Sequence, residues 1–430
     1  MKSIITKTCL LIALFALCFS LLSCASTAFN YSKSSMIPDD FFGISPDRSP
    51  LLQEDFNLLD NFNATWIRST IRWTGVEPEE GRWEFEYWDN YISKAEAAGK
   101  KIILILGFDS RWLYEDNKEQ RNLGERELPY FLKYVEQVVT RYGTRVAYEI
   151  WNEPNWVFWY GSDENFFALS AATAKRIREL EPNAIVLAGS TSRVDKKFTR
   201  GMFRSGAMEN TDGFSVHPYG ASPNGTMRQI NKLQKIFNEF NYDKPIWVTE
   251  VGYSTGPISF CNIREYPDYI VKTLSGLATR ADGVRNLLWY EFMDTYNPGE
   301  IKNRLDFENY FGLIYPNRTL KPGAHAFMLT ANHIAGTQYN PDNLTREKVK
   351  KSVTSLYFTK EDGTNTLILW KNGVGRRNLR LTVPGAISLS QYNIHNGEAN
   401  LLPENPVLKV KKSPIIITWA EGSAPRLTKK

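Results

Sequence analysis

The feature that most constrains the fold is a regular alternation of apolar, strand-like runs with segments of helical spacing. Residues 101–106 form an unbroken apolar run after the first lysine, which is typical of a strand buried on both faces. Helical patterns at 84–98 and 125–142 stand on either side of it. Strands separated by helices predict parallel βαβ units, and about eight such units predict a closed barrel.

The expected class is therefore α/β, a (β/α)8 TIM barrel. We expect its strands at residues 42–45, 65–70, 101–106, 146–151, 184–188, 214–217, 245–250 and 286–291. Its expected helices lie at residues 51–62, 84–98, 125–142, 164–180, 227–240, 266–281 and 323–334.

After residue 338 the pattern changes to short strands at 353–358, 366–370, 379–383 and 415–419, separated by turn signals such as Asn396-Gly397. No helical pattern intervenes, so a small C-terminal antiparallel β-sandwich is predicted. It could be an appendage packed on the barrel or a separate sugar-binding module. The predicted division is an export signal at 1–29, a linker at 30–41, the barrel at 42–337 and the β domain at 338–425.

Two expected strands end in a glutamate. Glu153 stands in Trp151-Asn152-Glu153-Pro154, and Glu250 ends the run from Trp247. Barrels of this kind place their chemistry at the carboxyl ends of the strands. Two carboxyl groups there are what glycoside hydrolysis requires, one as acid and base and one as nucleophile.

These motifs resemble the clan A glycoside hydrolases, which are retaining enzymes on a (β/α)8 barrel. The text around them is most similar to family 39 and its relatives, with family 5 next, over roughly residues 42–327. The resemblance implies hydrolysis of a β-linked oligo- or polysaccharide, with Glu153 as acid/base and Glu250 as nucleophile. The alternatives are a transglycosylase and a catalytically inert barrel that binds glycans.

The resemblance implies further roles at positions that match the families' motifs. Asn152 matches an asparagine that binds the sugar's 2-hydroxyl. Arg68 matches an arginine near the nucleophile, although Arg72 is an alternative. Thr70 stands where close relatives often carry an acidic or polar residue, so the resemblance does not extend to the identity of the sugar.

Aromatic residues and one histidine complete the expected binding site. His217 and Tyr219 match a His-x-Tyr pattern, in which the tyrosine hydroxyl bonds the nucleophile. Trp289 and Tyr290 match a pair that lines the sugar subsite, with core packing as the alternative. Trp156 follows the acid and is expected on the leaving-group side.

The N-terminus predicts export. A basic start, Met1 to Lys7, precedes an apolar run from Cys9 to Leu22 that is short for a membrane-spanning helix. Leu21-Leu22-Ser23-Cys24 resembles a bacterial lipoprotein cleavage box, which predicts membrane anchoring through a lipidated Cys24. The alternative is ordinary cleavage after Ala28.

Composition excludes other classes. The net charge of +5 over 430 residues and the lack of long basic runs argue against a nucleic acid partner. A carbohydrate partner suits the 12 tryptophans, although a large core would also use them. The four histidines are scattered and no phosphate-binding glycine loop occurs, so we expect no metal and no cofactor. Cys261 is the only cysteine after the export segment, so a disulfide within the body is excluded.

Overall fold

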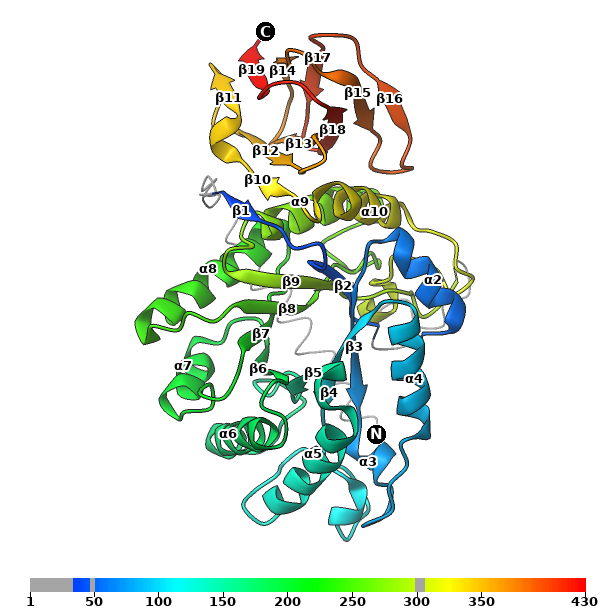
Figure 1. Cartoon of the computed structure of the whole chain (residues 1–430), viewed down its shortest axis with the longest axis vertical. Coiled ribbons are helices and arrows are strands. Elements are labelled where there is room, and N and C mark those ends of the chain that lie inside the picture. The colour runs from blue at the N-terminus through cyan, green and yellow to red at the C-terminus, as the bar shows by residue number, and fades with distance from the viewer. Residues whose placement is uncertain (1–33, 47–50, 298–305) are drawn as a thin grey trace.

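The computed structural model describes residues 34–46, 51–297 and 306–430. The export signal at 1–29, with Cys24, lies outside these residues and stays a prediction. Eight parallel strands close into a barrel in chain order, as Figure 1 shows. They are β2 (Phe42–Ile44), β3 (Trp66–Ile71), β4 (Lys101–Leu106), β5 (Val146–Ile150), β6 (Ile185–Ser192), β7 (Gly213–His217), β8 (Ile246–Val251) and β9 (Val284–Trp289).

Helices surround the barrel. They are α2 (Gln53–Asn61), α3 (Trp73–Val76), α4 (Glu86–Ala97), α5 (Leu128–Tyr142), α6 (Asp163–Leu180), α7 (Lys196–Arg204), α8 (Pro223–Phe240), α9 (Tyr266–Ala278) and α10 (Pro322–Ile334). None of those in the described ranges is both long and apolar enough to cross a membrane. Short 3-10 turns are η1 (Arg111–Leu113), η2 (Gly143–Arg145), η3 (Phe307–Tyr310) and η4 (Pro341–Asn343).

The barrel confirms the predicted fold class, with two helices that the sequence pattern did not predict, the one-turn α3 and the longer α7. Helix α7 begins after Asp195, whose carboxylate accepts hydrogen bonds from the backbone N–H groups of Lys197 and Phe198. This side chain satisfies donors that an N-terminus would otherwise leave unpaired. The preceding strand β6 also runs further than expected, to Ser192.

One layer of side chains fills the barrel interior. Trp66 and Trp247 meet edge to face inside it, with ring centroids 5.3 Å apart. The layer consists of Trp66, Ile103, Ala147, Leu187, Trp247 and Leu288. Because side chains alternate along a strand, residues two positions further on also point inward, nearer the carboxyl ends.

The C-terminal part folds into two sheets, as the sequence predicts. The first has seven strands, in the order β1 (Ser35–Met36), β10 (Gln338–Tyr339), β12 (Val353–Thr359), β13 (Thr364–Lys371), β18 (Ile415–Ala420), β15 (Ile387–Tyr392) and β16 (Ala399–Leu401). The second has four, in the order β11 (Thr345–Glu347), β19 (Arg426–Lys429), β14 (Arg377–Thr382) and β17 (Val407–Val410). The pairs are antiparallel except β11 with β19.

Two domain boundaries differ from those expected. Residues 30–41 were expected to be a linker, but Ser35–Met36 form β1, which pairs with β10 in the seven-stranded sheet. The last strand, β19, continues past residue 425 to Lys429. Strand β1, at the start of the described residues, therefore joins strands of the C-terminal part in the seven-stranded sheet.

The seven-stranded sheet packs on α9 and α10 of the barrel (Figure 1). Alternation along β12 divides its side chains: Leu356 and Phe358 join the barrel's core cluster, whereas Tyr357 joins the core between the two sheets. Polar contacts reinforce the junction. Thr366 Oγ1 donates to the carbonyl of His333 at 3.1 Å, and Ser413 Oγ donates to Asp268 at 2.6 Å.

Candidate active site

Charged residues replace the apolar layer at the carboxyl ends of two barrel strands, β3 and β5. Arg68 and Glu149 each stand two positions beyond an interior residue, Trp66 and Ala147 respectively, and both are almost wholly buried. The alternation that points the apolar layer inward points these side chains inward as well. The upper part of the barrel is therefore charged, at the end where barrel enzymes hold their chemistry.

Arg68 holds this part of the barrel together. Its guanidinium donates through Nε to Glu149 and through Nη1 to Glu250. Its Nη2 donates to Asn152 Oδ1 at 2.8 Å and to Ser190 Oγ at 3.2 Å. Four strands thus meet at one buried cation. The alternative residue, Arg72, has a half-exposed side chain 3.7 Å from Glu119.

Glu149 is a buried carboxylate whose role the sequence did not reveal. It accepts a hydrogen bond from Thr249 Oγ1 at 2.8 Å in addition to its ion pair with Arg68. Burial opposes the charged form, but the positive charge of Arg68, together with His217 and hydrogen bonds from Ser215 and Arg68, outweighs it and lowers the pKa of Glu149 below its ordinary value. Glu149 therefore stays ionised and balances Arg68.

This pair predicts how stability depends on pH. A carboxyl whose pKa is lowered by folding stabilises the native state above its unfolded pKa of about 4.3, and this stability is lost as the pH falls through the folded value. Between pH 5 and about 3, the free energy of unfolding of the wild type should fall more steeply than that of Glu149→Gln. Urea unfolding at a series of pH values measures both slopes, and parallel curves would contradict the assignment.

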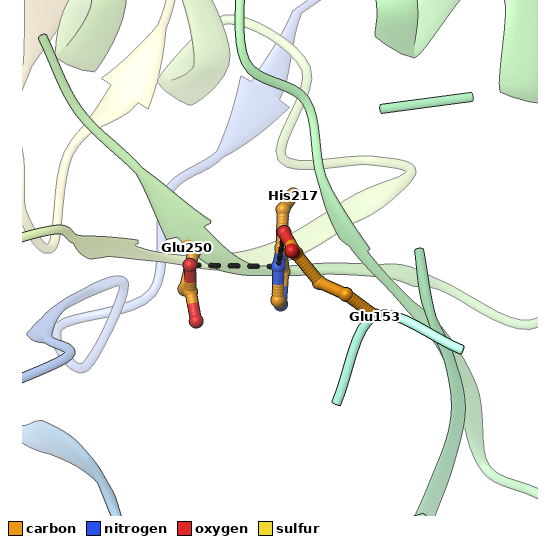
Figure 2. A group of neighbouring side chains, drawn as sticks. All are labelled: Glu153, His217 and Glu250. Atoms are coloured by element: carbon orange, nitrogen blue, oxygen red, sulfur yellow. Dashed lines mark hydrogen bonds and ion pairs between the residues drawn. The ribbon is translucent and has the colours of Figure 1, made fainter. Parts of the chain in front are cut away.

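Glu153 and Glu250 face each other across His217, as Figure 2 shows. One carboxylate oxygen of each glutamate and a ring nitrogen of His217 all lie within 4.8 Å of one another. His217 Nδ1 is 2.8 Å from Glu153 Oε1 and 3.5 Å from Glu250 Oε2. The backbone N–H of Glu153 donates to the carbonyl of Ser190 at 2.8 Å, which fixes the loop that carries this side chain.

Tyr219 lies beside the second glutamate. Its hydroxyl donates to Glu250 Oε2 at 2.9 Å. Burial, and then the negative charge of Glu250, raise the pKa of Tyr219 well above its ordinary value, so the hydroxyl keeps its proton. Tyr290 lies against Tyr219 with ring centroids 6.3 Å apart, and its own hydroxyl donates to Glu308 Oε2 at 3.2 Å. Glu308 lies on η3.

Two tryptophans lie apart from this group. Trp289 was expected to line a sugar subsite, but its side chain is fully buried and its Nε1 donates to Tyr266 Oη at 3.1 Å. Its neighbour Leu288 points into the barrel, so Trp289 points outward to the helices, and the core-packing alternative describes it. Trp156, in the loop after Glu153, has 58% of its surface exposed and is free to meet a ligand from solvent.

Glu153, His217 and Glu250 offer two oxygens and a nitrogen that could hold a metal ion. The guanidinium of Arg68 contacts Glu250 directly, and its positive charge repels a cation at that point. The two carboxyl groups and the imidazole therefore suit proton transfer and nucleophilic attack better than metal binding.

A parallel eight-stranded barrel with two glutamates facing each other at its carboxyl end defines a class, the barrel glycoside hydrolases. A family model described as cellulase, glycosyl hydrolase family 5, matches residues 32–290. The chain belongs to this family and is a glycoside hydrolase. No curated protein matches it with significant similarity.

Solved structures share the fold. A family 39 glycoside hydrolase from the gut symbiont Bacteroides cellulosilyticus WH2 is 20% identical with a TM-score of 0.73, over 89% of this chain and 81% of its own. A monomeric β-xylosidase from Caulobacter crescentus CB15 is 14% identical with a TM-score of 0.63, over 90% and 98%. A family 30 subfamily 8 xylanase from Clostridium acetobutylicum is 14% identical with a TM-score of 0.58, over 90% and 97%.

The predicted resemblance to the clan A glycoside hydrolases is thereby confirmed. The matching model is that of family 5, the second of the two families that the sequence resembles. A family 39 enzyme is among the proteins with a similar fold.

Proposed function

We propose that this glycoside hydrolase cleaves a β-linked oligo- or polysaccharide with retention, through a covalent intermediate on Glu250. The observation that carries the proposal is the approach of Glu153 and Glu250 oxygens to within 4.8 Å. Retaining pairs stand about 5–5.5 Å apart, whereas inverting pairs need about 6.5–9.5 Å to admit a water molecule between carboxylate and sugar. The short separation favours direct attack by a carboxylate.

Glu250 is suited to the role of nucleophile by its two donors. Arg68 Nη1 and the Tyr219 hydroxyl both donate to its carboxylate, and hydrogen bonds to the charged form favour that form. The lone pairs of an ionised Glu250 can then attack the anomeric carbon. The bond to the leaving oxygen breaks in the same step.

Glu153 is suited to the complementary role of acid and base. A carboxylate at Glu250 disfavours a second negative charge nearby, so Glu153 holds a proton that it can give to the leaving oxygen. Once Glu250 becomes a neutral glycosyl ester, that repulsion is gone. Glu153 then takes a proton from water, which attacks the anomeric carbon and releases the sugar. His217, in contact with both carboxyl groups, positions Glu153 through its Nδ1.

Asn152 is placed to contact the sugar. Its Oδ1 accepts from Arg68 Nη2, which leaves its amide N–H groups to donate. We propose that they bind the 2-hydroxyl beside the anomeric carbon, where a hydrogen bond strengthens toward the transition state. The β-xylosidase and xylanase among the similar folds make xylosides the first substrates to try.

The test is hydrolysis of aryl β-glycosides and β-linked polysaccharides by the chain from Asn30 onward, followed by proton NMR of the first sugar released. The proposal expects the β-anomer first, before mutarotation. Initial release of the α-anomer would overturn retention. A folded protein that binds glycans without releasing sugar would overturn the catalytic role of the pair.

Replacing Glu153 with alanine should affect substrates unequally. Removing a general acid lowers rates by about 10²–10⁴-fold where the leaving group needs a proton. Natural glycans should show that loss in kcat/KM, whereas aryl glycosides with acidic phenols should lose far less at the bond-breaking step. Comparing kcat/KM across a series of phenols tests this, and an equal loss at every leaving group would contradict the assignment.

A further inference from the structure

Basic residues concentrate in the C-terminal β domain. Over residues 338–430, lysine and arginine outnumber aspartate and glutamate about two to one, whereas over the whole chain the two kinds are nearly balanced, at 52 and 47. The seven-stranded sheet of this domain packs on the barrel, so the four-stranded sheet forms its outer layer (Figure 1). Positive charge gathered on that outer layer attracts an anionic partner.

Strand pairing brings four of these cations together on the outer face of β14 and β17. Alternate residues of both strands are buried in the core between the two sheets, so the others point outward. Lys409 on β17 is the register partner of Asn378 on β14. The outward positions that flank Asn378 are Arg376 and Arg380, and the next outward position after Lys409 is Lys411. Opposed positions of neighbouring strands have Cβ atoms about 4.5–5.5 Å apart, so these side chains share one small area. We call the four exposed cations Arg376, Arg380, Lys409 and Lys411 the basic face.

The basic face has no acidic side chain paired with it. Among the residues that the structure describes, none of its four cations forms an ion pair. The outward-facing acid of the same sheet, Glu347 of β11, pairs with Arg426 at 2.6 Å, and β11 lies at the opposite edge of the sheet from β17. Glu404 precedes β17, at the end of that strand away from Lys411. Like charges on neighbouring strands repel each other, and a bound anion relieves this repulsion.

A hollow of about 610 Å³ opens beside the basic face. The residues that line it are Gly373, Val374, Gly375, Arg376, Lys411 and Lys412. Lys412 turns toward the barrel, where its Nζ pairs with Glu265 at 2.7 Å. Lys272 of α9 donates through its Nζ to the carbonyl of Lys412 at 2.7 Å. These contacts fix the loop after β17, so the hollow holds Arg376 and Lys411 together on a firm base.

Val374 projects from the edge of this hollow. Its surface is 96% exposed, and the glycines on either side of it have positive φ angles, 77° at Gly373 and 87° at Gly375. The buried ammonium of Lys371 donates to the backbone carbonyls of Asn372 and Val374, which fixes the turn. A single exposed valine is ordinary on a protein surface. Here, however, it stands at a fixed tip that is surrounded by cations.

We propose that the basic face and the Val374 tip dock the β domain onto an anionic phospholipid bilayer. The cations meet the lipid phosphates while Val374 enters the headgroup layer, and such a combination of charge and apolar contact holds peripheral proteins on membranes. A glycan fits this surface less well, because β11, β14, β17 and β19 contain no aromatic residue on which a sugar ring could stack. The proposal goes beyond the proposed function and does not depend on it.

The test measures how the chain from Asn30 onward partitions onto vesicles. This chain lacks Cys24, so a lipid anchor cannot contribute to binding. Co-sedimentation compares vesicles of phosphatidylcholine with phosphatidylglycerol against vesicles of phosphatidylcholine alone. Dextran sulfate serves as a soluble polyanion, and its binding is measured by calorimetry.

Two matched variants each lose three exposed cations. The face variant carries Arg376→Gln, Lys409→Gln and Lys411→Gln. The control variant carries Lys94→Gln, Lys133→Gln and Lys235→Gln, on α4, α5 and α8 of the barrel. Urea unfolding checks that both variants keep the stability of the wild type.

The wild type should bind the vesicles that contain phosphatidylglycerol and should leave them as salt is raised to 1 M, where the Debye length is about 3 Å. The face variant should lower the partition coefficient at least about tenfold, since each cation near an anionic surface strengthens binding about fivefold. The control variant should change it by less than about twofold. Vesicles of phosphatidylcholine alone should bind all three proteins weakly.

A fluorescent label reports whether the tip enters the bilayer. A dye that is sensitive to its environment is attached to Val374→Cys and, as a control, to Leu401→Cys at an exposed position on β16. The native Cys261 is buried and therefore reacts little. Phosphatidylglycerol vesicles should shift the emission to the blue at position 374 and not at position 401, and dextran sulfate should shift neither.

Four outcomes would overturn the proposal. They are equal binding to the two kinds of vesicle, an equal loss in the face and control variants, the same emission change at both labels, and tight binding of dextran sulfate without binding of vesicles. The last outcome would assign the basic face to a soluble polyanion such as an acidic polysaccharide.

Discussion

Glu250→Ala should lower hydrolysis of β-linked glycans by at least about 10⁴-fold, since removing a covalent nucleophile has effects of this order or larger. The fold should survive, because Arg68 keeps its contacts with Glu149 and Asn152. The truncation leaves room beside the anomeric carbon on the side from which Glu250 attacks. A small anion can enter there, so azide should restore part of the activity toward aryl glycosides.

The product identifies the mechanism. Azide that replaces Glu250 attacks the face opposite the leaving group, so a β-glycoside should yield the α-glycosyl azide, which NMR detects. Glu80→Ala, at an exposed position, serves as the control and should keep full activity. Near-wild-type rates in Glu250→Ala, or recovery of the β-azide, would exclude the nucleophile assignment.

Arg68→Met should destabilise the protein by about 3–5 kcal/mol, because removing one partner of a buried ion pair leaves an uncompensated charge. Methionine keeps an apolar chain similar to the arginine stem, so the loss reflects charge more than volume. Glu149 would remain fully buried, with hydrogen bonds from neutral hydroxyls such as that of Thr249 but without its cation. Glycan hydrolysis should fall as well, since Glu250 and Asn152 would both lose contacts that orient them.

A double variant separates charge from packing. Arg68→Met with Glu149→Gln removes both charges and should recover a large part of the lost stability, as replacement of whole buried pairs generally does. Arg72→Met removes an exposed cation and should change stability by less than about 0.5 kcal/mol. Urea unfolding at pH 7 measures all four proteins. A loss below about 1 kcal/mol in Arg68→Met would contradict the central role of this cation.

Much of the site could be predicted because its key residues end recognisable strands. Buried parallel strands appear as apolar runs, and Glu153 and Glu250 stand where two such runs stop. The predicted approach of Arg68 and Tyr219 to the nucleophile likewise agrees with the contacts that each makes with Glu250. Their roles in catalysis remain predictions.

Glu149 was missed because it lies inside an apolar run. The available signal was the alternation of side chains along a strand. Ala147 points into the barrel, so Glu149, two residues later, points inward as well, as Arg68 does after Trp66. Alternation also explains Trp289. Leu288 points inward, so the next side chain must point out to the helices, whatever the family motif suggests.

The elements that the sequence did not predict are short or bury few residues. Helix α7 has only nine residues and several basic side chains, and its buried residues are Phe198, Thr199 and Met202, so its apolar face spans little of the sequence. Strands β15 and β16 lie at one edge of their sheet and have few buried positions. An element that buries little apolar surface leaves little hydrophobic periodicity in the sequence, and its structure is decided by tertiary contacts.

The pairing of β1 with β10 has a consequence for how the chain is made. The strand that borders the sheet is among the first described residues to leave the ribosome, and its partner comes only after the whole barrel. The apolar face of the barrel that packs on Leu356 and Phe358 of β12 is therefore covered only after the C-terminal segment has been made. A chain truncated near residue 337 would expose that apolar face to solvent, and exposed apolar surface of this kind promotes aggregation. The β domain thus completes the barrel, and the two should melt as one cooperative unit.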